Sequence, residues 1–215
     1  KLSENLFKGL APWMSRLPGG LIHVNVVGCA LFAAISGSSA ATVATVGKMS
    51  IPELRKRNYP EKLLLGSLAG SGTLGLLIPP SIILIIYGVT VQESIAKLFI
   101  AGIIPGIMIA IFFMFYVIGW SILNKNIMPK VEETFSFSQK IKQSGQLIPI
   151  IALIVAVIGS IYVGIATATE AASLGVVGAL ILSFFQKSLN KETFKLSLLG
   201  ATKTSCMIAF ILAGS

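Results

Sequence analysis

The chain has 215 residues, of which 54% are hydrophobic and 12% are charged, and its mean hydropathy is +0.88. A soluble domain carries about 25% charged residues, so this composition excludes an ordinary soluble protein and indicates a membrane protein. The net charge of +9 comes from Lys and Arg residues in loops between apolar segments, as the positive-inside rule predicts, and we expect no nucleic-acid partner. Cys29 and Cys206 lie in apolar stretches without a CxxC motif, so neither a disulfide scaffold nor a cysteine metal site is predicted.

Residues 1–20 are of mixed polarity and carry Trp13 and Arg16. Because Trp favours the headgroup level, we predict an interfacial segment on the cytoplasmic side. The first residue is not Met and the last apolar segment stops at Ser215, so we expect an internal fragment of a longer protein.

Residues 21–47 are apolar but contain the run Ser36-Gly37-Ser38-Ser39, and their length suits either one span or a hairpin of two half-helices. The next loop, Lys48 to Lys62, holds five basic residues and is expected in the cytoplasm. If Arg16 lies on the same side, the segment must enter and return on that side. We therefore predict a re-entrant hairpin over residues 21–47, with its tip near Ser36–Ala40.

Residues 63–89 are uncharged and long enough to cross a bilayer, yet Gly residues and Pro79–Pro80 interrupt them. Proline removes a backbone donor and disfavours helix at the preceding residue. Irregular backbone at membrane depth occurs where protein or a water-filled cavity surrounds it. This segment is therefore predicted to be a discontinuous helix with a binding site at its break.

The rest of the chain alternates apolar segments with basic loops. We predict a spanning helix, kinked at Pro105, over residues 98–123 and a partly amphipathic cytoplasmic linker over 124–146. Scaffold helices are predicted over 147–165, 170–185 and 204–215, with a cytoplasmic loop over 186–203. The expected fold class is an all-α polytopic membrane protein.

Two polar breaks, at residues 36–42 and at Gly70-Ser71-Gly72-Thr73, offer oxygen ligands. Unwound carbonyls and Ser or Thr hydroxyls suit Na⁺, and the positive ends of half-helices suit an anionic group. No carboxylate lies near either break, which argues against a tight divalent-cation site. The alternative is that Gly and Ser only let helices approach closely. Two clusters, one at a predicted hairpin tip and one before a Pro-Pro break, favour the binding site.

Two further hypotheses concern Glu170 and the Gly-Ser pairs. Glu170 borders an apolar span and is either a functional intramembrane carboxylate or part of a helix N-cap, and the preceding Ala-Thr-Ala-Thr favours the cap. The Gly-Ser pairs at Gly37-Ser38 and Gly70-Ser71 raise an intramembrane serine hydrolase. That enzyme needs a base beside its serine, and His23 is the one histidine in the sequence, so we predict no enzyme.

Several motifs occur in a recognisable order: SGSSAATVATVG from Ser36, IPELRKRNYP from Ile51, LIPPSIILIIYGV from Leu77 and SIAKLFIAGIIPG from Ser94. This order closely resembles the large membrane subunit of tripartite ATP-independent periplasmic (TRAP) transporters. ATATEAASLG from Ala166 resembles the family's Thr-Pro-Thr-Glu-Ala-Ala pattern, with Ala168 where Pro is usual. The resemblance extends over essentially the whole chain.

The resemblance implies an elevator-type secondary transporter in the bacterial inner membrane, built from two inverted repeats. Its expected partners are a small four-helix membrane subunit, separate or fused, and a periplasmic substrate-binding protein. The substrate would be a small carboxylate such as a C4-dicarboxylate or sialic acid, with Na⁺ as the coupling ion and no other cofactor. The second hairpin and its matching helix would lie beyond Ser215, and early scaffold helices before Lys1.

Carried over by position, the resemblance also implies site residues. The expected sodium ligands are Ser36, Gly37, Ser38, Gly72 and Thr73. The expected substrate contacts are Ser39, Thr42 and Ser81, with Thr42 standing where many members of the family carry Asp. Two other functions stay open at this point: a divalent-anion/sodium symporter that needs no binding protein, and a membrane enzyme or a structural membrane subunit.

Overall fold

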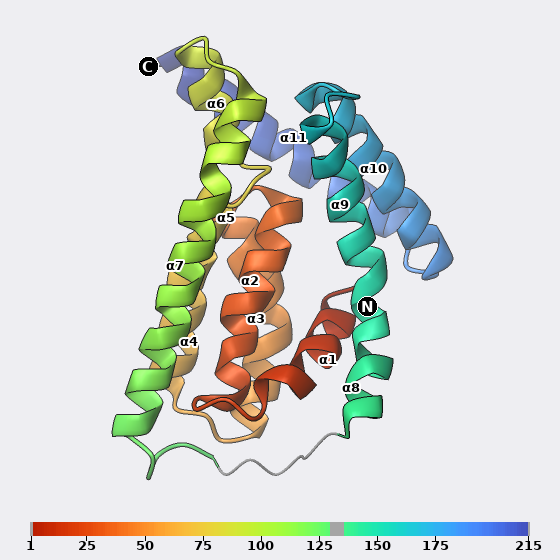
Figure 1. The fold of residues 1–215 in the computed structure, drawn as a ribbon. Coiled ribbons are helices and arrows are strands. Elements are labelled where there is room, and N and C mark those ends of the chain that lie inside the picture. The colour runs from red at the N-terminus through yellow and green to blue at the C-terminus, as the bar shows by residue number, and fades with distance from the viewer. Residues whose placement is uncertain (1, 130–135, 215) are drawn as a thin grey trace.

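The computed structural model describes residues 2–129 and 136–214, and in these ranges the chain is helical between short connections (Figure 1). Three helical segments are long and apolar enough to cross a membrane: Glu61–Thr90, Ile95–Leu123 and Ala168–Phe185. The bent pair Phe137–Ser144 and Ile148–Tyr162 would make a fourth if it forms one span. The prediction of an all-α polytopic membrane protein is confirmed.

The first helix, α1 (Leu2–Met14), crosses the lower end of the next two helices in Figure 1. Its side chains Leu6, Phe7 and Leu10 are buried in the main hydrophobic core, whereas Trp13 remains 42% exposed. In the predicted interfacial segment over residues 1–20, these three side chains are therefore held by protein contacts, and Lys1 lies outside the described residues. The depth of the segment in a bilayer stays a prediction.

The next helices form a hairpin. A short 3₁₀ turn, η1 (Gly20–Ile22), leads into α2 (His23–Ser36), and α3 (Ser39–Lys56) runs back beside it. In Figure 1 both open ends of this hairpin lie at the end of the molecule where α4 begins and α7 ends, and the tip stops partway along α7. A re-entrant hairpin requires this arrangement, and re-entry itself stays a prediction.

The base of the hairpin differs from the expected basic loop. Helix α3 continues to Lys56, so the connection to the next helix is limited to residues 57–60. Arg55 forms an ion pair with Glu61 across this connection. Tyr59 fixes it to the other end of the hairpin, because its hydroxyl accepts a hydrogen bond from the Leu21 N–H at 3.0 Å. Burial raises the pKa of the Tyr59 phenol, so the group stays neutral at physiological pH.

The segment predicted as a discontinuous helix forms three pieces: α4 (Glu61–Gly72), α5 (Leu74–Leu77) and α6 (Ile82–Thr90). The main break lies at residues 78–81, where Pro79 and Pro80 have no N–H to continue the helical ladder. Ser81 closes the end of α5, since its hydroxyl donates to the Leu76 carbonyl at 2.6 Å.

Helix α7 (Ile95–Leu123) is one continuous helix with Pro105 inside it, and it begins three residues before the predicted Leu98 because Ser94 caps it. The described part of the predicted linker ends in α8 (Phe137–Ser144), followed by η2 (Gly145–Leu147) and α9 (Ile148–Tyr162). Residues 130–135 of that linker lie outside the described residues.

The last two helices are α10 (Ala168–Phe185) and α11 (Lys191–Gly214). Helix α11 starts well before residue 204, so most of the loop predicted over 186–203 is helical. Asn190 accounts for the early start: its side-chain oxygen accepts hydrogen bonds from the Thr193 N–H at 2.7 Å and the Thr193 hydroxyl at 2.6 Å, as an N-cap does. Ser215 of the predicted last helix lies outside the described residues.

Candidate functional site

The hairpin tip is built from a helix end and a helix start. Helix α2 ends at Ser36, Gly37 follows in the left-handed conformation with φ of 59°, and Ser38 is the extended N-cap of α3. The Thr42 hydroxyl donates to the Ser38 carbonyl at 2.7 Å and lies 2.9 Å from the Ser36 hydroxyl. One turn of α3 thus closes the tip with side-chain hydroxyls.

The tip contacts the break in the discontinuous helix through backbone atoms. The Ile82 N–H, at the start of α6, donates to the Gly37 carbonyl at 3.2 Å. A Cβ atom added to Gly37 would lie 2.7 Å from the Pro80 carbonyl oxygen. A Cβ atom added to Gly75 would lie 2.8 Å from the Ser39 nitrogen. Glycine at both positions therefore lets the two irregular segments meet.

The predicted sodium ligands do not all lie together. Ser36, Gly37 and Ser38 form the tip itself. Gly72 instead gives Val43 of α3 room to pack against α4, because a Cβ there would collide with the Val43 side chain. Thr73 is exposed, and its hydroxyl donates to the Gly70 carbonyl at 2.7 Å. The structure thus places the first three of these residues at the meeting point with α5 and α6.

The predicted substrate contacts are partly committed to internal bonds. Thr42 and Ser81 are fully buried, and both hydroxyls donate to backbone carbonyls. Ser39 is half-buried at the first turn of α3, next to Gly75. Thr42 and Ser81 therefore shape the tip and the break, and their hydroxyls would have to exchange partners to donate a hydrogen bond to a ligand.

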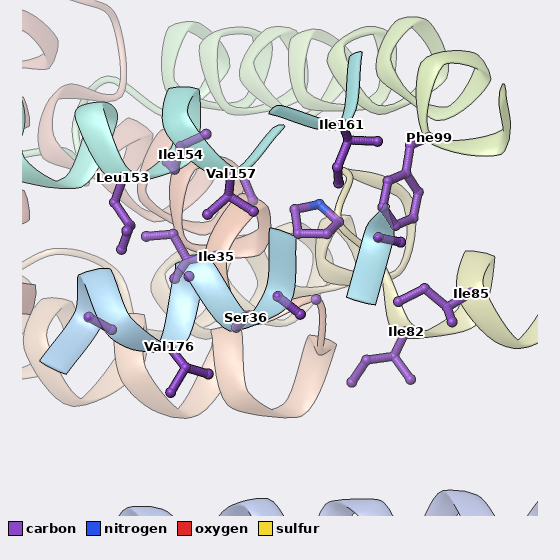
Figure 2. Close-up of a pocket in the computed structure, with 17 residues that line it drawn as sticks. Ile35, Ser36, Ile82, Ile85, Phe99, Leu153, Ile154, Val157, Ile161 and Val176 are labelled. Atoms are coloured by element: carbon purple, nitrogen blue, oxygen red, sulfur yellow. The ribbon is translucent and has the colours of Figure 1, made fainter. Parts of the chain in front are cut away.

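A cavity of about 390 Å³ adjoins the tip. Figure 2 shows its lining side chains, which come from the end of α2, the start of α6, α7 and the facing helices α9 and α10. Ser36 and Gly37 are the predicted site residues that line it. The other lining residues are Ala34, Ile35, Pro80, Ile82, Ile85, Phe99, Leu153, Ile154, Val157, Ile161, Ala168, Ala172, Gly175, Val176 and Ala179.

Sequence reasoning missed the cavity wall on α10 and the role of Gly75. The signal for the wall is the spacing of small residues: Ala168, Ala172, Gly175 and Ala179 recur every three or four positions, which places them on one face of a helix. Nothing local marks Gly75, because its importance comes from the backbone of the hairpin tip, which lies far away in the sequence.

A buried polar ladder fixes α2 to α4 behind the tip. The Asn25 amide nitrogen donates to the Leu64 carbonyl at 3.2 Å and to the Ser67 hydroxyl at 3.0 Å. Ser71 donates to the Ser67 carbonyl at 2.6 Å. The two bonds from Asn25 hold the hairpin against the discontinuous helix, whereas the Ser71 bond lies within α4.

Glu170 belongs to a capping box at the start of α10. Its carboxylate accepts hydrogen bonds from the Thr167 N–H at 2.7 Å and the Thr167 hydroxyl at 2.8 Å, and that hydroxyl in turn accepts from the Glu170 N–H at 3.3 Å. This geometry is the reciprocal pairing of Ser/Thr-x-x-Glu sequences. The N-cap interpretation of Glu170 is confirmed.

The chemistry that this arrangement allows is binding by neutral oxygens and backbone amides. The tip and the break hold carbonyls and hydroxyls, and the N-termini of α3 and α6 begin beside them. Among the described residues, no group of three or more His, Cys, Asp or Glu side chains could hold a metal ion.

The sequence pattern of the family described as the DctM component of tripartite ATP-independent periplasmic transporters matches residues 1–215. The chain is 34% identical to the C4-dicarboxylate TRAP transporter large permease protein DctM of Pseudomonas aeruginosa, over 94% of this chain and 47% of that protein. It is 34% identical to the isethionate TRAP transporter permease protein DctMQ of Oleidesulfovibrio alaskensis, over 99% of this chain and 33% of that protein. It is 32% identical to the sialic acid TRAP transporter permease protein SiaT of Haemophilus influenzae, over 98% of this chain and 34% of that protein.

The chain thus spans about half the length of the DctM relative and about one third of the length of each of the other two relatives. The family pattern nevertheless matches every residue of the chain, and the relatives named above are permease proteins of one transporter class. The chain belongs to the DctM family of TRAP transporter permeases.

Proposed function

We propose that this chain forms part of the large permease subunit of an importer that couples uptake of a small organic anion to sodium entry. The observation that carries the proposal is the hydrogen bond from the Ile82 N–H to the Gly37 carbonyl, which joins the hairpin tip to the break in the discontinuous helix. Two irregular segments in contact within a membrane domain are the usual setting of a transporter's binding site.

In this mechanism Na⁺ takes carbonyl and hydroxyl oxygens of the Ser36–Ser38 tip as ligands. The bound ion orders the tip against the break, and with it the N-termini of α3 and α6. Their N–H groups and positive dipole ends favour an anionic group of the substrate, such as a carboxylate. Coupling then follows, because sodium binds the ordered state more tightly than the open one and shifts the population toward it.

The substrate class rests on the relatives. C4-dicarboxylate, isethionate and sialic acid, which appear in the names of the three relatives, are all small organic anions. The name of the isethionate relative, DctMQ, supports a second membrane component in the system, and we propose a small membrane subunit, separate or fused, as one partner. A periplasmic substrate-binding protein is the other proposed partner.

The test is uptake by the full transporter in proteoliposomes, with its membrane partner and binding protein present. Replacing Ser38 with Ala removes one candidate sodium ligand, so we expect uptake to require higher sodium while membrane insertion stays normal. Because Ser38 is also the N-cap of α3, Ser94→Ala serves as the matched control: Ser94 is the exposed N-cap of α7, and its hydroxyl accepts from the Lys97 N–H in the same way. Unchanged sodium dependence in the Ser38 variant would contradict the assignment of the sodium site.

A second arm of the same experiment omits the binding protein. We expect uptake to fall to the level of empty liposomes, because the permease would then receive no substrate. Full uptake without the binding protein would instead indicate an anion/sodium symporter that works alone.

A further inference from the structure

The hydroxyl group of Thr42 lies at the centre of a short chain of hydrogen bonds inside the hairpin tip. It donates to the Ser38 carbonyl at 2.7 Å, because a carbonyl oxygen has no proton to give. Its one proton is thereby used, so Ser36 is the donor at the 2.9 Å contact between the Ser36 and Thr42 hydroxyls. The chain therefore has one direction, from Ser36 through Thr42 to the Ser38 carbonyl.

The surroundings keep the Ser36 proton inside the tip. A second possible acceptor for it is the Ser38 carbonyl at 3.3 Å, which already accepts from the Thr42 N–H at 3.0 Å and from the Thr42 hydroxyl. Both acceptors belong to the tip itself. Thr42 is fully buried, so water does not compete for its hydroxyl. The orientation of the Ser36 hydroxyl is thus set by Thr42 and the carbonyl behind it.

The Ser36 oxygen keeps one acceptor position for a ligand. A hydroxyl oxygen has two lone pairs, and the Ser38 N–H uses one of them at 3.4 Å. Ser36 also lines the cavity beside the tip (Figure 2). With its proton directed into the tip, this oxygen can accept but has no proton to donate to a carboxylate. It is therefore suited to a cation such as Na⁺, which takes neutral oxygens as ligands.

We propose that Thr42 is a positioning residue for sodium, because it holds the Ser36 hydroxyl in the accepting orientation and so favours the cation over an anionic substrate at this oxygen. This inference rests on the proposed function, since it concerns the sodium site at the same tip. It gives Thr42 a different role from the substrate contact expected from the sequence. Thr42 acts through Ser36 and touches neither the ion nor the substrate.

The experiment replaces Thr42 with Val, which nearly keeps the shape of the side chain and removes the hydroxyl. Uptake by the full transporter is measured in proteoliposomes while sodium is exchanged for choline at constant ionic strength. We expect the sodium concentration for half-maximal uptake to rise about threefold to tenfold, the size of losing one hydrogen bond, with the maximal rate retained. Thr42→Ala removes the same hydroxyl with a smaller side chain and should give the same shift.

Three further variants separate positioning from a merely structural role. Thr42→Ser keeps the hydroxyl and should retain the sodium dependence of the unchanged protein. Thr202→Val is the matched control, because its exposed hydroxyl on α11 also donates to the carbonyl four residues earlier. In a Ser36→Ala background, Thr42→Val should raise the half-maximal sodium concentration little further, because the residue through which Thr42 acts is already gone.

Four outcomes would overturn the role of Thr42. An unchanged half-maximal sodium concentration in Thr42→Val would do so while leaving the proposed sodium coupling intact. Sodium-independent uptake by the unchanged protein would overturn the proposed function, and this inference with it. A higher half-maximal substrate concentration at saturating sodium, with sodium dependence unchanged, would make Thr42 a substrate contact. An equal rise with and without the Ser36 hydroxyl would show that Thr42 does not act through Ser36.

Discussion

At the scale of single residues, Gly37 combines two constraints that no other amino acid meets. Its φ of 59° is in the left-handed region, and its α-carbon faces the Pro80 carbonyl so closely that a Cβ would lie 2.7 Å from that oxygen. Left-handed backbone is tolerated by glycine, and close backbone approach needs the missing side chain. The contact between hairpin and broken helix therefore depends on this residue.

We predict that Gly37→Ala reduces both uptake and thermal stability. The left-handed backbone alone costs an alanine about 1–2 kcal/mol, and the collision with Pro80 adds to that cost. The matched control is Gly164→Ala, because Gly164 has φ of 76° but nothing within 4 Å of its added Cβ. Uptake and melting temperature of the purified transporter measure the two effects. Equal losses in the two variants would show that the Pro80 contact has no importance of its own.

At the scale of elements, the sequence predicted those helix ends that are formed by a cap or a break within a few residues of the end. The Gly/Ser run marked the turn between α2 and α3, and Pro79–Pro80 marked the break before α6. The Ala-Thr-Ala-Thr run before Glu170 marked a cap at the start of α10, which begins at Ala168, two residues before the predicted start. Each of these ends depends on residues within a few positions of it.

The features that could not be predicted depend on distant partners. The burial of Leu6 and Leu10 in the core needs the helices that cover α1, and Gly75 matters because the hairpin tip packs on it. Asn190 is a local N-cap signal for the early start of α11. The basic residues that follow it lower the hydropathy of the segment, and a loop was therefore predicted there. Of the predicted site, the sequence indicated the tip but not its cavity.

The capping box gives a prediction at this scale. Glu170→Gln should leave uptake and stability near those of the unchanged protein, because Gln can also accept the hydrogen bond from the N-cap. Thr167→Ala should lower the stability of the start of α10 by about 1 kcal/mol, which a thermal melt can detect. If Glu170→Gln folds normally but abolishes uptake, the carboxylate has a functional role beyond the cap.

At the scale of the whole molecule, the arrangement of chain ends predicts sidedness. Arg16 precedes the hairpin and Lys56 ends it, and both are exposed. Gln92 is exposed beyond α6, at the other end of the Glu61–Thr90 segment. A re-entrant hairpin places the first two residues on one side of the membrane and Gln92 on the other.

This topology can be checked with cysteine labelling. In a Cys206→Ser background, where Cys29 is buried, Arg16→Cys, Lys56→Cys and Gln92→Cys are each treated with a membrane-impermeant maleimide in right-side-out vesicles. We expect Gln92→Cys to react at once, and the other two only after permeabilisation. Reaction of Arg16→Cys and Lys56→Cys from opposite sides would mean that residues 21–47 simply span the membrane.

The bond between Gly37 and Ile82 also bears on the order in which the protein is made. The hairpin tip is synthesised well before the N–H that pairs with its carbonyl, and an unpaired carbonyl is costly in hydrocarbon. If the hairpin re-enters the membrane as predicted, we expect its tip to be less stable in lipid until α6 leaves the ribosome. We therefore predict that the α2–α3 pair is sheltered, at the translocon or near the membrane surface, until the broken helix arrives beside it.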